Sequence, residues 1–489
     1  MCTVKLSLPS SKVIVVCVSV AIAALWLPDT TTAVARRNTR IQDSGGTPDQ
    51  TQTRTRSQAP PSLDLRLFRI ADSSSSDRIG NDIRSLVGFG TRHTLSDTLS
   101  PARGIGAARR WIKTEFDTIS RACDDCLEVS FQRSLVEGRE GSRIPRDTWI
   151  VNVVAILRGT RFPDRYIIMS GDIDSRISSA LNDSSDSPGA NDNASGMAGV
   201  IEAARLLSPY SFPTSLVFVG LSGEEQGLFG GKAMAEKAVA EGWNIVGVLN
   251  NDMIGNISGI DGVIDNAAFR IFSEPTPATE DERSRQRRRF TGGEVDGPSR
   301  QLARYVERTT RQILPEMNPM LIYRLDRFGR GGHHRPFNDV GFSGIRIMEA
   351  YENYTRQHQD LRVENGIAYG DVIEGVDFTY AAKLTAVNAI NLASLAWAPP
   401  EPENVRIGGA VSPSTTLIWD EVDDPNLAGY FVYWRETTAP QWTNSRFVGI
   451  TSRYTLESIV IDNYLFGVAS VGMNGNQSVV SFPSGSIRR

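Results

Sequence analysis

The sequence contains few of the residues from which redox centres and zinc sites are usually built. Its 489 residues include only 4 cysteines and 4 histidines. Cys2 and Cys17 lie in the N-terminal stretch, which leaves Cys123 and Cys126, separated by two aspartates, in the rest of the chain. A zinc knuckle would need a second pair of ligands nearby, and acidic neighbours disfavour a reactive thiolate. We therefore expect Cys123 and Cys126 to form a disulfide in an oxidising compartment.

The sequence also lacks a strong charge of either sign. Lys and Arg total 52, Asp and Glu total 56, and the net charge is -4. This balance gives no general positive field for a nucleic acid, so we expect no nucleic-acid partner. The dense basic run at residues 283–289 directly follows Glu280, Asp281 and Glu282, and such a charge run is typical of a solvated loop.

An apolar stretch long enough to span a membrane is missing as well. The apolar run at residues 13–27 has about 15 residues, whereas a membrane-spanning helix needs about 20. Lys5 and Lys12 precede this run and a small-x-small site follows it at residues 33–35, which predicts a signal peptide over residues 1–35. An uncleaved anchor is the alternative. Cleavage would give a secreted, periplasmic or extracellular protein without stable membrane insertion.

The remaining chain divides into a leader and a folded region. Residues 36–62 are rich in Thr, Gln, Ser, Arg and Pro, so we expect a disordered leader. From residue 63 to residue 398, apolar runs alternate with helical segments. This alternation predicts an α/β/α sandwich around a mixed, largely parallel sheet, with its site at the carboxyl ends of the strands. The main apolar runs lie at residues 148–157, 166–169, 215–220 and 244–249.

The last part of the chain has a different pattern. Residues 399–403 form a proline-rich linker, and residues 404–489 alternate apolar and polar residues with turns between them, which predicts a small all-β sandwich. The segments ENVRI, TTLIWD, YFVYWR and YLFGVASV, with Trp419 and Tyr464 as core residues, resemble a fibronectin type III domain. We expect this module to stabilise or position the preceding domain, with contact to a surface, a glycan or a protein as the alternative.

Acidic residues follow the apolar runs of the predicted sheet. Because the carboxyl ends of parallel strands meet at one edge, we expect these side chains to converge. Carboxylates gathered in one place raise each other's pKa unless a cation neutralises them, so a metal site is the simplest explanation. The residues are Asp172 and Asp174 after 166–169, Glu224 and Glu225 after 215–220, Asp252 after 244–249, and Asp192 in a loop of small residues before a helix.

The motifs PGANDNASG, GEEQGLFGG, NNDMIG, GGHHRPF and ENYTRQHQD occur in this order. Together they resemble the co-catalytic zinc exopeptidases, which include bacterial leucyl aminopeptidases, glutaminyl cyclase and the glutamate carboxypeptidase II group. The resemblance covers residues 63–398. It implies that Asp192 bridges two metal ions, that Glu225 and His358 complete one site, and that Asp252 serves the other.

One position departs from the family pattern. The family usually has His-x-Asp where this chain has Asp172-Ile173-Asp174, and Asp174 would be the carboxylate two residues beyond a ligand. A carboxylate at 172 can still bind zinc, but an all-carboxylate site would shift its preference toward Mn or Mg; alternatively this site is weak or empty. We expect His333 and His334, where the family more often has Asp-His, to line the substrate site.

The sequence therefore predicts a secreted metal-dependent aminopeptidase with one or two zinc ions and peptide or protein substrates. Glu224, adjacent to the predicted ligand Glu225, would act as general base on a metal-activated water. One alternative is a glutaminyl cyclase-like acyltransferase with a single zinc. The other is a catalytically silent binding protein, in which Asp172 marks the loss of activity.

Overall fold

The computed structural model describes residues 59–487, and the predicted signal peptide and most of the predicted leader lie outside them. The described part begins with α1 (Leu65–Asp72), α2 (Ser76–Gly88) and α3 (Gly104–Ala122). Side-chain caps fix the N-termini of α1 and α2, because Asp64 accepts from the backbone N–H of Arg66 and Ser75 accepts from that of Arg78. None of the described helices is both long and apolar enough to cross a membrane.

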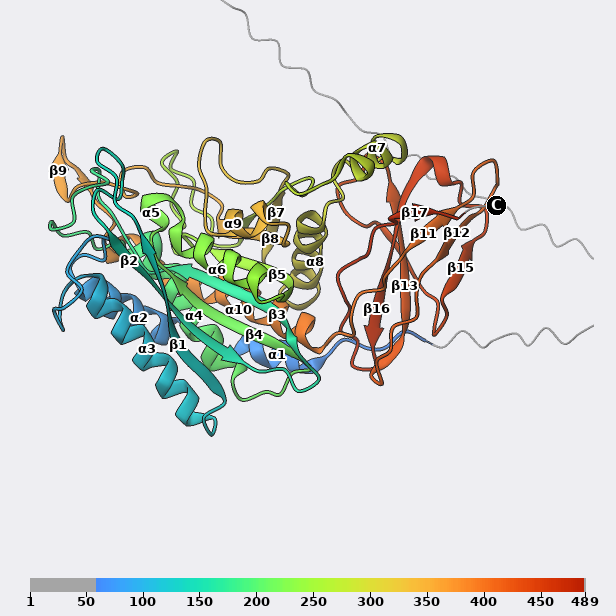
Figure 1. Ribbon diagram of the computed structural model, residues 1–489, viewed down its shortest axis with the longest axis horizontal. Coiled ribbons are helices and arrows are strands. Elements are labelled where there is room, and N and C mark those ends of the chain that lie inside the picture. The colour runs from blue at the N-terminus through green and yellow to red at the C-terminus, as the bar shows by residue number, and fades with distance from the viewer. Residues whose placement is uncertain (1–58, 488–489) are drawn as a thin grey trace, which may run out of the picture. The chain divides into compact units, whose positions relative to one another are not determined.

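A mixed sheet forms the centre of the first domain (Figure 1). Within residues 59–487 its eight strands lie in the order β1-β2-β4-β3-β5-β8-β6-β7. Strands β4, β3, β5 and β8 run parallel to one another, β6 and β7 are antiparallel to β8, and β1 and β2 extend the sheet as an antiparallel edge. The strands are β1 (Leu127–Val136), β2 (Thr148–Leu157), β3 (Phe162–Asp172), β4 (Thr214–Leu221), β5 (Asn244–Asn251), β6 (Ala268–Ser273), β7 (Asn318–Ile322) and β8 (Gly344–Glu349).

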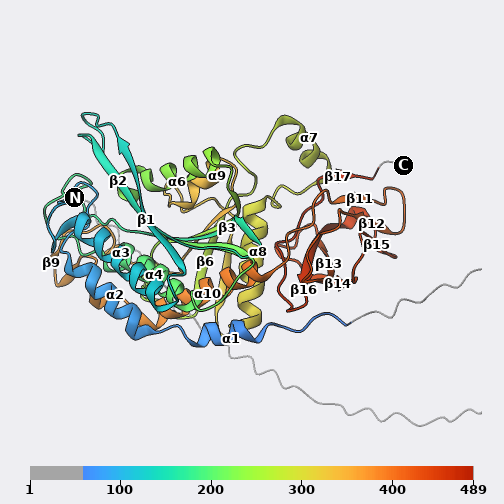
Figure 2. The ribbon, with the colours of Figure 1, turned by 60° about the horizontal axis from the view of Figure 1, so that its bottom comes forward.

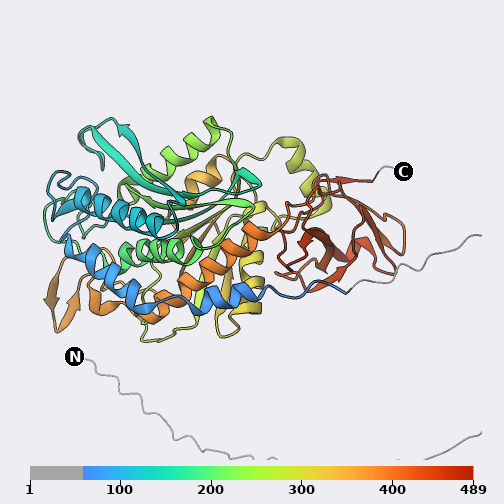
Figure 3. The same cartoon turned by 90° about the horizontal axis from the view of Figure 1, so that it is seen from below.

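Helices cover both faces of this sheet (Figure 2, Figure 3). Alternate residues of β3 face opposite layers, because successive strand side chains point to opposite sides. Ile167 and Met169 pack in the core under α4 (Gly196–Leu207) and α10 (Phe378–Trp397), whereas Ile168 packs with α6 (Phe229–Ala240) and α9 (His334–Asp339). The arrangement confirms the predicted α/β/α sandwich.

The basic run at residues 283–289 was expected to be a loop, and this expectation is wrong. It lies in α7 (Glu282–Thr291), where Asp281 caps the first turn by accepting from the backbone N–H of Ser284 at 2.7 Å. Arg288 pairs with Glu280 at 2.7 Å. The acidic residues before the run therefore stabilise a helix start, and the helix still buries none of its side chains.

The C-terminal region confirms the predicted all-β fold. In the described part of the chain it contains one sheet in the order β15-β12-β11-β17 and another in the order β14-β13-β16. Trp419 lies in the shared core and Tyr464 packs against it. The resemblance to a fibronectin type III domain stays a prediction. The strands are β11 (Arg406–Gly408), β12 (Thr415–Ile418), β13 (Leu427–Glu436), β14 (Asn444–Phe447), β15 (Arg453–Leu456), β16 (Tyr464–Gly472) and β17 (Gly485–Ser486).

Short elements complete the fold. A disulfide joins Cys123 and Cys126 directly after α3. The short strands β9 and β10 form an antiparallel pair beyond the main sheet. The remaining elements are α5 (Glu224–Gly227), α8 (Pro298–Ile313), β9 (Arg362–Glu364), β10 (Ile367–Tyr369), η1 (Ala190–Ser195), η2 (Ile373–Gly375) and η3 (Ile461–Asn463).

Candidate metal centre

The parallel strands end at the same level and bring distant acidic residues together. In the sheet register, Gly171 of β3 lies opposite Gly220 of β4 and Asn251 of β5. Asp172 ends β3, α5 with its two glutamates follows β4, and Asp252 follows β5. The sheet therefore places the predicted residues at its carboxyl edge, as the alternation of strands and helices indicated.

Asp192, Glu225 and His358 form a compact cluster at this edge. His358 Nε2 lies 3.0 Å from Asp192 Oδ2 and 2.9 Å from Glu225 Oε1. One potential ligand atom from each residue lies within 4.8 Å of the other two. A tetrahedral Zn²⁺ with bonds of about 2.0–2.1 Å separates its ligand atoms by roughly 3.3 Å, so these three side chains fit a zinc ion after small movements.

Positively charged side chains lie beside the two carboxylates of this cluster. Burial opposes the effect, but Glu225 and Asp192 raise the pKa of His358 to about 9. Against burial, His358 in turn holds the pKa values of Asp192 and Glu225 below their ordinary values. Arg176 adds a further positive charge, with Nε 2.7 Å from Glu225 Oε2. His358 and Arg176 therefore place positive charge beside the two buried carboxylates, at the position where a metal ion fits.

Asp174 positions the two glutamates. Its carboxylate accepts from the backbone N–H of Glu224 at 3.2 Å and of Glu225 at 3.1 Å, and from Thr94 Oγ1 at 2.8 Å. It therefore holds the first turn of α5, which presents Glu224 and Glu225 at the carboxyl edge of the sheet.

Glu224 is half-buried and its carboxylate has no hydrogen-bond or ion-pair partner within residues 59–487. Burial raises its pKa well above the ordinary value, and the charges of Glu225 and Asp252 add to this. A carboxylate with free oxygens beside a metal cluster is suited to accept and deliver a proton.

Asp371 supports the loop of Asp192, and sequence reasoning missed it. Its carboxylate accepts from the backbone N–H of Asn191 at 2.9 Å and of Asp192 at 2.6 Å. A single aspartate in a loop far along the chain gives no pattern that would have found it. Its two hydrogen bonds hold the backbone on which Asp192 sits.

The other predicted ligands, Asp172 and Asp252, do not join the cluster. Asp172 Oδ1 lies 2.5 Å from His333 Nδ1, and its Oδ2 accepts from Asn193 Nδ2 at 2.7 Å. Asp252 Oδ2 pairs with Arg346 Nη2 at 2.8 Å. These partners take both oxygens of Asp172 and one oxygen of Asp252, so a second metal ion would have to displace them.

The two neighbouring histidines play different parts. His333 contacts Asp172, and its Nε2 is buried without a partner in the described chain. His334 lies with Nε2 2.8 Å from the backbone oxygen of Leu325 and 3.6 Å from Asp326. His333 is therefore the one beside the acidic edge, while His334 is bound to the preceding loop.

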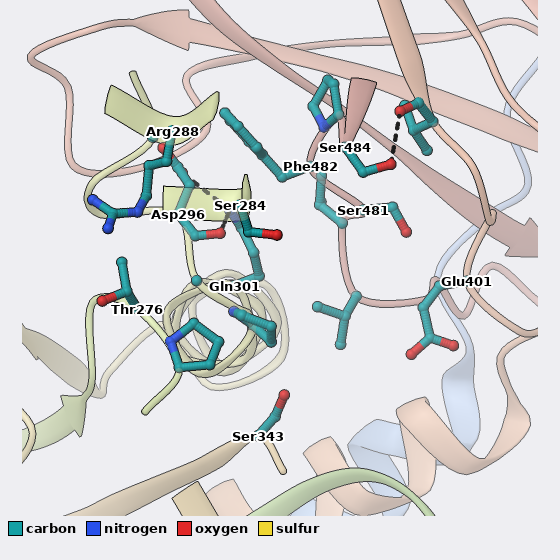
Figure 4. A pocket seen from close by; sticks show the side chains of 18 of the residues that line it. Thr276, Ser284, Arg288, Asp296, Gln301, Ser343, Glu401, Ser481, Phe482 and Ser484 are labelled. Atoms are coloured by element: carbon teal, nitrogen blue, oxygen red, sulfur yellow. Dashed lines mark hydrogen bonds between the residues drawn. The ribbon is translucent and has the colours of Figure 1, made fainter. Parts of the chain in front are cut away.

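A cavity of about 520 Å³ lies away from this edge. It is lined by α7, α8 and C-terminal residues, including Asp296, Gln301 and Phe482 (Figure 4). None of the clustered carboxylates lines it. The cavity is therefore separate from the candidate centre. A smaller space lies beside the centre, and its lining includes Asp192, Glu349 and Asp371.

An α/β/α sandwich that gathers two carboxylates and a histidine beyond its parallel strands defines a metalloenzyme-type centre. A model of peptidase family M28 matches residues 152–361, which include Asp172, Asp192, Glu224, Glu225, Asp252 and His358. The chain also matches curated relatives along most of its length. A protein of Pyrenophora tritici-repentis described as a "Probable zinc metalloprotease" is 39% identical over 430 residues, covering 87% of this chain and 99% of the relative.

A second relative, from Leptosphaeria maculans and with the same description, is 41% identical over 424 residues, covering 86% of this chain and 98% of its own. The chain belongs to peptidase family M28 and is a metal-dependent peptidase of the zinc type.

Solved structures with a similar fold are distant in sequence. The LapA aminopeptidase of Legionella pneumophila is 14% identical with a TM-score of 0.49, over 70% of this chain and 78% of that one. A glutaminyl cyclase of Macrostomum lignano is 15% identical with a TM-score of 0.48, over 69% and 94%.

Proposed function

We propose that the protein is a secreted zinc aminopeptidase that removes N-terminal residues from peptides. The observation that carries this proposal is the position of the unpaired carboxylate of Glu224 beside the cluster of Asp192, Glu225 and His358. These three residues would hold the ion, which when bound would activate a water molecule and polarise the scissile carbonyl.

The residues of this chain would have separate roles in the reaction. Glu224 would take a proton from the attacking water and deliver it to the leaving amine. Asp174 would keep Glu224 and Glu225 in place through their backbone N–H groups. Arg176 would orient Glu225, and Asp371 would hold the loop that carries Asp192. Such supports matter because small displacements of catalytic groups reduce rates strongly.

The substitution Glu224→Gln tests the assignment of the base. We expect kcat on leucine p-nitroanilide to fall by about 10²–10⁴, because the amide cannot accept the proton. The zinc content, measured by mass spectrometry of the purified protein, should not change. Glu236→Gln on the exposed face of α6 is the matched control and should keep full activity. Unchanged activity of the Glu224→Gln variant would refute the mechanism.

The exopeptidase assignment needs its own measurement. A peptide with a free N-terminus should be cleaved from that end, and its N-acetylated form should resist cleavage. Internal cleavage of the acetylated peptide would show an endopeptidase instead.

A glutaminyl cyclase is the second candidate, and the single complete ligand set of Asp192, Glu225 and His358 favours it. A peptide beginning with glutamine discriminates between the two. Pyroglutamate as the sole product, with no release of amino acids from the anilide, would support the cyclase and exclude the aminopeptidase.

A further inference from the structure

Arg346 is a charged residue in the middle of the apolar strand β8. Its side chain is 0% exposed and that of its partner Asp252 is 4% exposed. The register of β5 and β8 places Arg346 opposite Asn250, two residues before Asp252. The guanidinium therefore reaches the carboxyl edge of the sheet from within the sheet itself.

The guanidinium is bound on both sides. Nη2 contacts Asp252 Oδ2 at 2.8 Å and the backbone oxygen of Asp252 at 3.3 Å. Nη1 contacts both oxygens of Asp326 at 3.1 and 3.2 Å and donates to the backbone oxygen of Gly331 at 3.0 Å. A guanidinium stays protonated in proteins, so this position carries a permanent positive charge.

The two carboxylate oxygens of Asp172 also have partners within the protein. One of its oxygens faces His333 and the other accepts from the side chain of Asn193. Both acidic residues that would complete a second metal site thus have partners inside the protein. A divalent cation at this place would have to displace these partners and would also lie next to the charge of Arg346.

From these contacts we infer that the guanidinium of Arg346 takes the place of a second metal ion, so that the centre holds a single ion at Asp192, Glu225 and His358. The inference deepens the proposed function and rests on it. The permanent charge of Arg346 is shared between Asp252 and Asp326 and lies where a second cation would otherwise bind Asp252. Arg346 is a positioning residue in this arrangement, because it fixes Asp252 and has no contact with the cluster in the described chain.

Counting bound ions tests the inference without reference to activity. The full chain is stripped with a chelator, equilibrated with excess Zn²⁺ or Mn²⁺, desalted and analysed by mass spectrometry of the metal. We expect about one ion per chain with either metal. Asp252→Asn should still bind about one ion, because Asp252 is not a ligand. Asp192→Asn should bind almost none.

A second variant tests whether Arg346 prevents a second metal ion from binding. Combining Arg346→Met with Asp326→Asn and Asp172→His removes the guanidinium, relieves the charge of Asp326 and supplies a histidine ligand. We expect about two ions per chain, and a larger rise of the melting temperature with added zinc than the natural chain shows. A folded variant that still binds one ion would overturn the inference.

The outcomes separate the two proposals. About two ions in the natural chain, falling to one in Asp252→Asn, would overturn the role of Arg346 and leave the proposed peptidase intact. No bound ion in the natural chain would overturn both. If the combined variant does not fold, the counts for the natural chain and Asp252→Asn decide the question by themselves.

Discussion

Glu349 is a buried carboxyl group near the candidate metal centre, and its surroundings shift its pKa. It ends β8, and its Oε2 accepts from Asn191 Nδ2 and from the backbone N–H of Asn256, both at 2.9 Å. Burial raises its pKa from about 4.5 to about 8; Glu352 adds to this rise and Arg270 opposes it. The folded protein therefore holds this proton more tightly than the unfolded chain does.

This difference predicts a pH-dependent stability. Between about pH 4.5 and pH 8 the folded state binds more protons at Glu349, so its contribution to stability is lost as the pH rises. Glu349→Gln keeps the acceptor oxygen and removes the titration. We expect the variant to match the natural protein at pH 5 and to melt a few degrees higher, about 3 °C, at pH 8.5. Calorimetry at both pH values measures this, with the exposed Glu236→Gln as control. Equal melting temperatures at pH 8.5 would contradict it.

At the residue level, the sequence predicts where the acidic residues lie better than it predicts which side chains pair with them. Asp192, Glu225 and His358 lie in recognisable motifs, so their convergence could be foreseen. Arg346 could not be assigned a role, because its pairing with Asp252 depends on the register of two strands distant in sequence. The separation of Asp172 from the cluster has the same cause, since His333 comes from a loop whose path the sequence does not reveal.

Among the secondary-structure elements, α5 is the one on which the chemistry depends. Its four residues cannot form a stable helix by themselves, and Asp174 accepts hydrogen bonds from its first two backbone N–H groups. The element is therefore held by the side chain of Asp174, which lies two residues beyond the end of strand β3.

The substitution Asp174→Asn tests this support. An amide presents one acceptor oxygen in place of two, so one of the two backbone N–H groups loses its partner. We expect zinc affinity to fall by about 10–100-fold, as for other residues that orient ligands, together with a loss of kcat. Competition with a chelating dye measures the affinity. Thr94→Val removes only the hydroxyl donor to Asp174 and should have a smaller effect. An equal loss in both variants would argue against the proposed role.

The predicted and observed elements agree where the hydrophobic pattern is strong. Strand β2 has the limits of the predicted apolar run at residues 148–157, because continuous apolar burial defines it. Strands β6 and β7 were not predicted, because they are short and lie at or near the edge of the sheet. Helix α7 was taken for a loop since its residues bury nothing, and it depends on a cap that only the structure reveals.

At the scale of the whole molecule, a buried group of charges joins the C-terminal β-sheets to the first domain. Asp296 contacts Arg304 of α8 at 2.7 Å and Arg435 of β13 at 2.7 Å. The side chains of Asp296 and Arg435 are 1% and 0% exposed. Arg304 also donates to the backbone oxygen of Pro440, and Trp442 Nε1 donates to Gln301. These contacts indicate that the two regions stabilise each other.

Removing the shared acid should weaken this connection strongly. Asp296→Asn leaves Arg304 and Arg435 buried without a counter-charge, and breaking a buried pair in this way costs about 3–5 kcal/mol. We expect a lower melting temperature and faster proteolysis in the linker at residues 399–403, measured by limited digestion and mass spectrometry of the fragments.

Glu282→Gln on α7 is the control for that change, because it removes an acid that pairs with Arg285 in a largely exposed position. Such a surface pair is worth about 0–1 kcal/mol, so this variant should melt and digest like the natural protein. If Asp296→Asn behaved like Glu282→Gln, the charge group would not hold the two regions together, and the apolar contacts around α8 would have to do so.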